Sequence, residues 1–143
     1  MMRATALRPL SGLVLLAAVA CSGDAPTTPP VGNTLTLLSI TPAPGTKLAP
    51  GSNVTFNGNL LFVLNSAGSA EVVLIFEDQN NRILNPASQP TSVVPGGQGE
   101  LNLPGQFAIP STGVSQLQVI YTLNPNANAA VPTTASATYP VGP

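Results

Sequence analysis

The single cysteine, Cys21, is the side chain of this sequence with the most evident covalent chemistry. A cysteine thiolate is a nucleophile and a soft metal ligand. The 143 residues contain no histidine, however, so Cys21 has no imidazole to activate it and no partner for a zinc site. Neither Lys47 nor Arg82 has a context typical of an activated base, and no phosphate loop, GxSxG or HExxH motif occurs. We therefore expect no enzyme activity and no bound cofactor.

Two adjacent carboxylates, Glu77 and Asp78, are the candidates for a cation site. They open the segment EDQNN, where several oxygen-bearing side chains stand at the close spacing that Ca²⁺ needs. The same segment is typical of a solvated hairpin tip, because Asn80 and Asn81 tolerate positive φ. The sequence favours the hairpin tip and leaves a weak calcium site as the alternative.

The charge content is low and excludes nucleic acid as a partner. The chain has four basic and five acidic residues. Arg3 and Arg8 precede Cys21, so a chain beginning at Cys21 keeps two basic side chains against the five acidic ones. Binding to a phosphate backbone depends on clustered Lys and Arg, and this sequence has no such cluster.

The N-terminus has the layout of an export signal. Residues 1–12 contain Arg3 and Arg8 and no acid, and residues 13–20, LVLLAAVA, are uninterruptedly apolar. As a helix these eight residues would span about 12 Å, far less than the roughly 30 Å hydrocarbon core of a bilayer. A basic start followed by a short apolar run and small residues predicts a signal peptide over 1–20.

The residues around the cysteine, Ala18-Val19-Ala20-Cys21, resemble the lipobox of bacterial lipoproteins. That family usually has leucine where Ala18 stands here. The resemblance implies cleavage between Ala20 and Cys21, a diacylglycerol on the thiol and an acyl chain such as palmitate on the new amino group. Several acyl chains anchor a protein stably in a membrane. The alternative is ordinary signal-peptidase cleavage after the A-x-A pattern, which would leave a free thiol.

The resemblance also implies a location. In such lipoproteins the residue after the cysteine influences sorting, and an aspartate there favours the inner membrane. This chain has Ser22, so we expect a lipid-anchored protein of the cell envelope, in the outer membrane if the cell has two.

Residues 21–34 are predicted to form a lipidated cysteine and a tether. The stretch SGDAPTTPPVGN that follows Cys21 has no apolar period and contains Pro26, Pro29 and Pro30. Such a segment is extended and largely disordered, and about twelve residues at 3.1 Å each reach on the order of 35 Å. A loop packed on the following domain is the alternative.

Residues 35–143 are predicted to form one all-β domain. Apolar and polar residues alternate with a period of two in several stretches, and Gly and Pro residues separate them. Gly58 within the longest stretch indicates a bulge or kink. Pro140 cannot donate to a ladder, so the last strand should lie at an edge or leave the sheet there. Strands are expected near residues 35–41, 53–64, 70–78, 81–85, 91–94, 99–103, 106–109, 115–123 and 133–141.

The domain resembles the immunoglobulin-like and fibronectin-III-like modules of exported bacterial proteins. The stretches SITPAPGTKLAPGSNVTF, AEVVLIFEDQNNR, QLQVIYTL and ASATYPV carry the resemblance, in that order. It implies a single immunoglobulin-like antiparallel β-sandwich. Tyr121 is a candidate for the tyrosine corner of such folds, although a plain core or rim tyrosine is the preferred interpretation.

Some apolar residues fall on the predicted outer faces of the strands. They indicate either a partner surface or strands covered on both sides by long loops, and the sequence does not decide between the two. The residues are Leu61, Val63, Val73, Ile75 and Ile120.

These features favour a lipid-anchored envelope protein whose sandwich is a non-catalytic binding, adhesion or assembly module. Its expected partners are the membrane, through the lipid, and an envelope protein or polysaccharide. The alternative function is a structural subunit of the envelope or of an extracellular polymer, assembled by edge-strand pairing.

Overall fold

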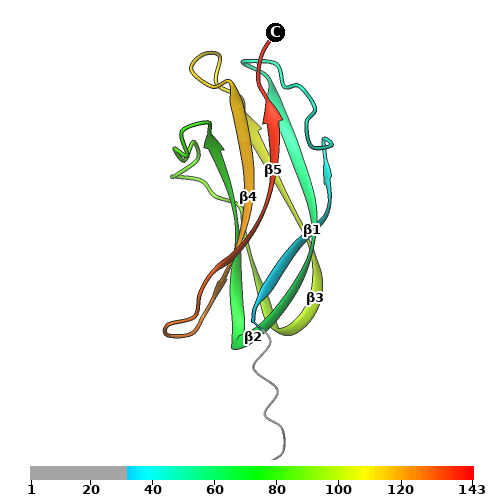
Figure 1. Cartoon of the computed structure of the whole chain (residues 1–143), viewed down its shortest axis with the longest axis vertical. Helices are drawn as coiled ribbons and strands as arrows, with labels where there is room; N and C mark the ends of the chain where they lie inside the picture. Colours follow the sequence, from blue (N-terminus) through cyan, green and yellow to red (C-terminus); the bar gives the residue numbers. More distant parts are fainter. Residues whose placement is uncertain (1–31) are drawn as a thin grey trace, which may run out of the picture.

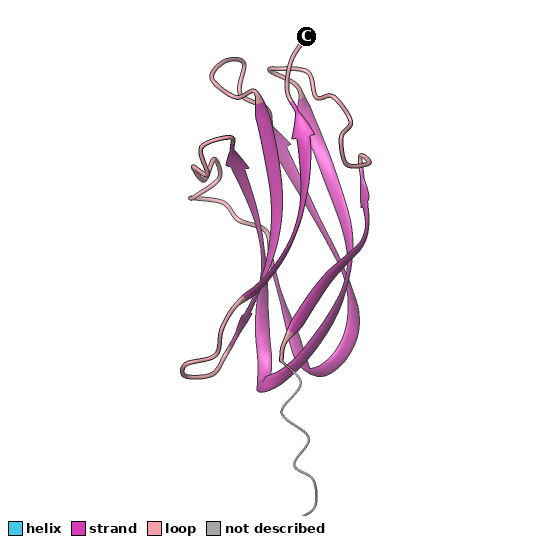
Figure 2. Ribbon diagram, viewed as in Figure 1, coloured by secondary structure: helices cyan, strands magenta, loops and turns pink. Residues whose placement is uncertain are grey.

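The computed structural model describes residues 32–143, so the predicted signal peptide, Cys21 and most of the predicted tether lie outside the described residues. The described part is all-β and antiparallel, as predicted, and contains no helix that could cross a membrane (Figure 2). Its strands are β1 (Thr34–Thr41), β2 (Asn53–Asp78), β3 (Thr91–Ala108), β4 (Gln116–Pro125) and β5 (Thr133–Pro140).

The two long strands, β2 and β3, fold back together at one end of the molecule (Figure 1). Their antiparallel ladder continues around this corner with one shift in register, between Leu64 and Ser69. A glycine allows the tight fold. A Cβ on Gly96 would lie 2.8 Å from the carbonyl oxygen of Ala67, closer than two such atoms can approach. Both strands therefore contribute to two layers.

The pairing on either side of the corner defines a sandwich. On one side, the first half of β2 pairs with β1 and with the second half of β3. On the other, the second half of β2 pairs with the first half of β3 and with β4, and β4 pairs with β5. A three-stranded layer thus faces a four-stranded one. The predicted antiparallel β-sandwich is confirmed, and this strand arrangement is of the immunoglobulin-like class.

Three local predictions were wrong. Pro104-Gly105 does not break a strand but lies inside β3, opposite Asn57 and Phe56. A strand over 81–85 does not form, because only Ile83 makes an isolated bridge, to Glu77. The register is unbroken at Gly58, and the irregularity of the first layer lies in β1, between Leu37 and Ser39.

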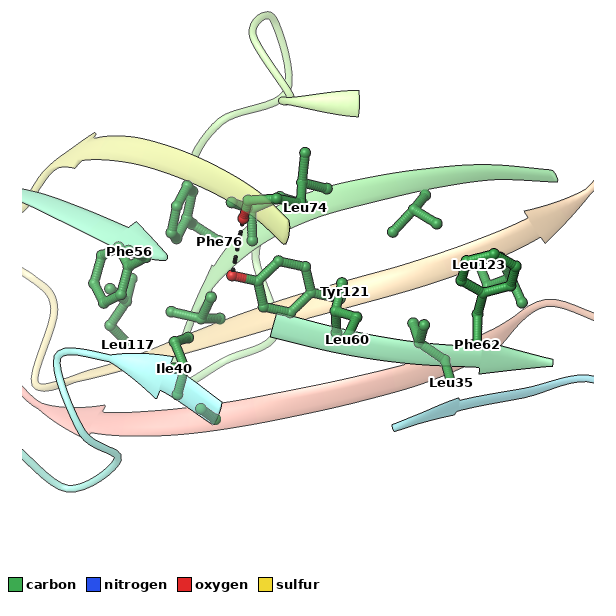
Figure 3. Packing of buried hydrophobic residues seen from close by; sticks show 14 of the residues in the cluster. Leu35, Ile40, Phe56, Leu60, Phe62, Leu74, Phe76, Leu117, Tyr121 and Leu123 are labelled. Atoms are coloured by element: carbon green, nitrogen blue, oxygen red, sulfur yellow. Dashed lines mark hydrogen bonds between the residues drawn. The ribbon is translucent and has the colours of Figure 1, made fainter. Parts of the chain in front are cut away.

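The core fills the space between the layers with aromatic and aliphatic side chains (Figure 3). The ring of Phe56 lies 5.4 Å from that of Phe76 and 5.2 Å from that of Tyr139, between centroids. Tyr121 crosses the core from β4, and its buried hydroxyl donates to the carbonyl of Leu103 on β3 at 3.4 Å. The hydroxyl thus bonds to a strand of the opposite layer. This contact fits a core tyrosine and not a tyrosine corner.

The outward apolar residues of the sequence are largely covered. Val73 is buried, and Leu61, Val63, Ile75 and Ile120 are half-buried. Ile75 on β2 stands directly opposite Ile120 on β4. The large hydrophobic side chains that the described chain does expose are Leu38, Ile83, Val93 and Val131.

Candidate functional site

The two ends of the sandwich present different features (Figure 1). We call the end with the β2–β3 corner and Gly32, the first described residue, the near end. The other end carries the loops over 42–52, 79–83 and 109–115 and the C-terminus, and we call it the far end.

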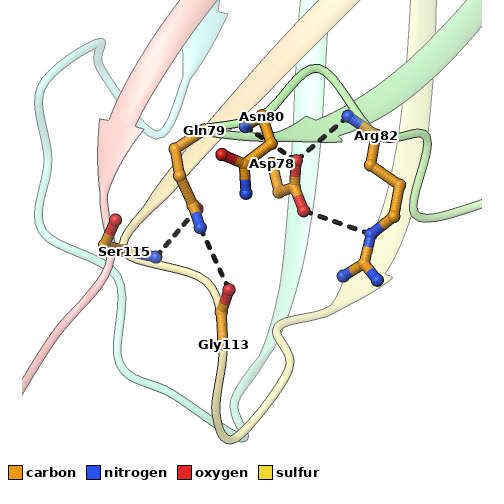
Figure 4. A network of polar contacts seen from close by, with 6 residues as sticks. All are labelled: Asp78, Gln79, Asn80, Arg82, Gly113 and Ser115. Carbon is orange, nitrogen blue, oxygen red and sulfur yellow. Dashed lines mark hydrogen bonds and ion pairs between the residues drawn. The ribbon is translucent and has the colours of Figure 1, made fainter.

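A tight turn built on Asp78 forms one of the far-end loops (Figure 4). One carboxylate oxygen of Asp78 accepts the backbone N–H groups of Asn80 at 2.9 Å and Arg82 at 3.0 Å. The other accepts from Nε of Arg82 at 3.2 Å. These contacts, the Arg82 N–H first, hold the pKa of Asp78 below its ordinary value against the opposing effect of burial. Asn81 takes the positive φ, 60°, that the sequence predicted for this turn.

The side chain of Gln79 ties this turn to the neighbouring loop (Figure 4). Its Nε2 donates to the carbonyl of Gly113 at 3.1 Å, and its Oε1 accepts the N–H of Ser115 at 3.1 Å. A shallow cavity of about 410 Å³ lies beside this clamp, lined by Gln79, Val114 and Val141 among others. These two hydrogen bonds join the turn after β2 to the loop before β4.

Glu77 and Asp78, the carboxylates of the alternative calcium site, are consecutive residues at the end of β2. As neighbours on a strand they point to opposite faces, and the oxygens of Asp78 are occupied by the turn. No group of three metal-ligating side chains occurs within residues 32–143. The calcium site stays a prediction, whereas the turn interpretation describes what this segment forms.

The two buried phenols, those of Tyr121 and Tyr139, donate hydrogen bonds to backbone carbonyl groups. Burial raises the pKa of Tyr121 to about 12, and that of Tyr139 likewise to about 12. Both therefore stay protonated near neutral pH. The hydroxyl of Tyr139 donates to the carbonyl of Pro42 at 2.8 Å and so fastens β5 to the end of β1.

A polar clamp at the near end was missed by sequence reasoning. Oδ1 of Asn33 accepts the N–H groups of Asn65 at 2.9 Å and Ser66 at 3.1 Å, and its Nδ2 donates to Oγ of Ser66 at 2.7 Å. Beside it lies a cavity of about 490 Å³, lined also by Val131 and Pro132. No ionisable side chain lines this cavity or the far-end one. The only sequence signal for the clamp was an asparagine next to the predicted tether.

The predicted anchor residues, Ala20 and Cys21, lie outside the described residues. Their position in the sequence means that a chain leading from them enters the domain at the near end, next to Asn33 (Figure 1).

Comparisons with known proteins add only a weak likeness. No family model and no curated protein matches the chain. Among solved structures, the chain is similar to the ASH/PapD-like domain of human CEP192 (PapD-like domain 7). The match has 13% identity and a TM-score of 0.36, and it covers 94% of this chain and 95% of that one. A likeness of this size carries no argument about function. The fold class, an immunoglobulin-like β-sandwich, rests on the strand pairing described above.

Proposed function

We propose that this protein is a lipid-anchored component of the cell envelope whose β-sandwich is a non-catalytic binding, adhesion or assembly module. The lipid would be a diacylglycerol with an additional acyl chain on Cys21, after cleavage behind Ala20. The partner would be an envelope protein or polysaccharide, and the outer membrane is the expected location in a cell with two membranes.

The placement of the two ends carries this proposal. The chain from Cys21 enters at the near end, whereas the clamped loops lie at the far end (Figure 1). An anchor at Cys21 would therefore leave the surface around Gln79 and Ser115 directed away from the membrane. This is the arrangement expected of a module that meets a partner at a distance from its own membrane.

The chemistry of the described residues also favours binding over catalysis. Asp78, the buried acidic residue of the described chain, is committed to a turn. Lys47 donates to the carbonyl of Pro143. A general acid or base must reach the reacting atom within about 3 Å in a site that holds the substrate, and neither cavity offers one.

The anchor is tested by replacing the thiol. We expect the wild-type chain to fractionate with membranes and to incorporate labelled palmitate in its native cell. Cys21→Ser removes the nucleophile that takes the lipid. The variant should therefore incorporate no label and should not yield the mature membrane-bound form. Ser22→Ala is the matched control, because it changes the neighbouring residue and keeps the thiol.

Two results would overturn the anchor. One is the absence of label from the wild-type chain in a cell whose other lipoproteins are labelled. The other is a Cys21→Ser variant that keeps both its label and its membrane fraction.

A further inference from the structure

The sandwich has unpaired strand edges along β1, β3 and β5. Such edges pair with other strands unless prolines, charges or bulges prevent it. The β3 edge is blocked by Pro95, Pro104 and the charge of Glu100. The β1 edge is distorted by the bulge between Leu37 and Ser39. Neither of these edges offers a flat, uncharged ladder.

The half of β5 toward the far end is closed by the chain that follows β1. The carbonyl of Thr138 accepts the N–H of Gly45 at 2.9 Å, and the carbonyl of Pro140 accepts the N–H of Leu48 at 2.9 Å. Leu48 also forms a parallel bridge with Val141. Pro140 lacks an N–H on this outward side, as the sequence predicted for an edge position.

The half of β5 toward the near end stays open. Backbone groups alternate in direction along a strand. The backbone carbonyl groups of Thr138 and Pro140 point outward, away from β4. By this alternation, the backbone N–H and C=O groups of Thr134 and Ser136 point outward as well. Both residues are exposed, and within residues 32–143 these outward backbone groups have no hydrogen-bond partner. The sequence of this open half, TTASA, contains no charge and no proline.

We infer that the open half of β5 pairs with the same segment of a second copy of this chain, antiparallel and about a two-fold axis. Thr134 of one copy lies opposite Ser136 of the other, which gives two hydrogen bonds at each pair and four in all. A two-fold interface must be self-complementary, and a segment without charge meets its own copy without repulsion. Opposed Thr and Ser side chains are a favourable cross-strand pair.

The geometry of this pair sets its strength and orientation. Five residues of edge cover far less than the roughly 1,600 Å² of a standard stable interface, so the pair should form at high local concentration. Antiparallel pairing of β5 puts the near ends of the two copies at opposite ends of the pair. If the chain is anchored as proposed above, such a pair suits copies presented from facing membranes, and this role rests on that proposal.

Sedimentation equilibrium of the full chain in a mild detergent tests the pair. For the wild type we expect an average mass that rises toward the dimer as the concentration approaches about 1 mM. Ser136→Pro removes the outward donor and leaves the inward ladder to β4 intact, so association should weaken by about tenfold or more. Ser136→Lys adds a charge to the edge and should act alike.

The matched controls are Gln106→Pro and Gln106→Lys. Gln106 is exposed, lies on the β3 edge and, by the same alternation, points its N–H outward. These variants should associate as the wild type does. If the circular-dichroism spectrum shows that Ser136→Pro does not fold, the association of Ser136→Lys is compared with the wild type instead.

A wild-type chain that stays monomeric at about 1 mM would overturn the inference. So would Ser136 variants that associate as strongly as the wild type. Failure of the lipid anchor would leave the association in solution unchanged, so the two proposals fail separately.

Discussion

At the scale of single residues, the contact between Gly58 and Tyr121 shows how the two layers are fitted together. The Tyr121 ring from β4 lies directly against the backbone of Gly58 in β2. A Cβ on Gly58 would lie 2.5 Å from Cζ of Tyr121. The glycine therefore serves the close approach of a side chain from the opposite layer, and not a bulge in its own strand.

We expect Gly58→Ala to destabilise the domain by about 1–3 kcal/mol, because the new methyl group overpacks the core against Tyr121. Urea unfolding followed by circular dichroism measures this. Gly68→Ala is the control, since nothing lies within 4 Å of the place that its Cβ would take, and its cost should stay within about 0.5 kcal/mol. Equal stability of the two variants would contradict the close approach.

The sequence alone could identify Gly58 as unusual but could not give its reason. A glycine in a strand indicates either a bulge or a close approach. The choice depends on which residue of the other layer stands opposite, and this follows from the pairing of β2 with β4. For Asp78 the local sequence sufficed, because the turn from Asp78 to Arg82 is built from residues within one hairpin.

At the scale of elements, the segment after the Asp78 turn replaces a strand that the sequence predicted over 81–85. The segment follows the edge of β2 without a regular ladder, and a side chain supplies the missing contacts. Oδ1 of Asn85 accepts the N–H of Phe76 at 2.9 Å, and Nδ2 donates to the carbonyl of Leu74 at 3.3 Å. The alternation of apolar and polar residues predicts a strand here. It cannot show that the amide side chain of Asn85 takes the place of a backbone partner.

We expect Asn85→Ala to destabilise the domain by about 1–3 kcal/mol, since it leaves the N–H of Phe76 without a partner at a part-buried site. The free energy of unfolding in urea measures this. Gln98→Ala removes an exposed amide on β3 that makes no side-chain hydrogen bond in the described chain, and it should cost less than about 0.5 kcal/mol. A neutral Asn85→Ala would show that the segment 83–90 is held by other contacts.

The strands themselves were largely predictable, because each buries one face and so shows a period of two. The prediction failed where strands bend and continue. The sequence predicts a break between strands at Pro104-Gly105, but a proline whose missing N–H faces away from the ladder is tolerated within an edge strand. The sequence also predicts separate strands over 91–94 and 99–103. In the structure both belong to β3, which continues around the corner at Gly96.

At the scale of the whole molecule, the fold separates the place where the chain enters from the far-end loops that Gln79 joins by hydrogen bonds. The near end is fixed by Asn33 and the far end by Gln79 and Asp78. The sequence predicted the sandwich. It could not predict which loops share an end, because this follows from the order of strands in the two layers. This separation is the reason for proposing a module that works at a distance from its anchor.

The lipid anchor on Cys21 is tested by the mass of the mature N-terminal peptide, measured on protein isolated from its native cell. The lipid-anchor proposal predicts a chain that begins at Cys21, with a diacylglycerol on the thiol and an acyl chain on the amino group. A chain that begins at Met1, or one that begins at Cys21 with a free thiol and a free amino group, would contradict the lipid anchor and with it the orientation proposed for the far-end loops.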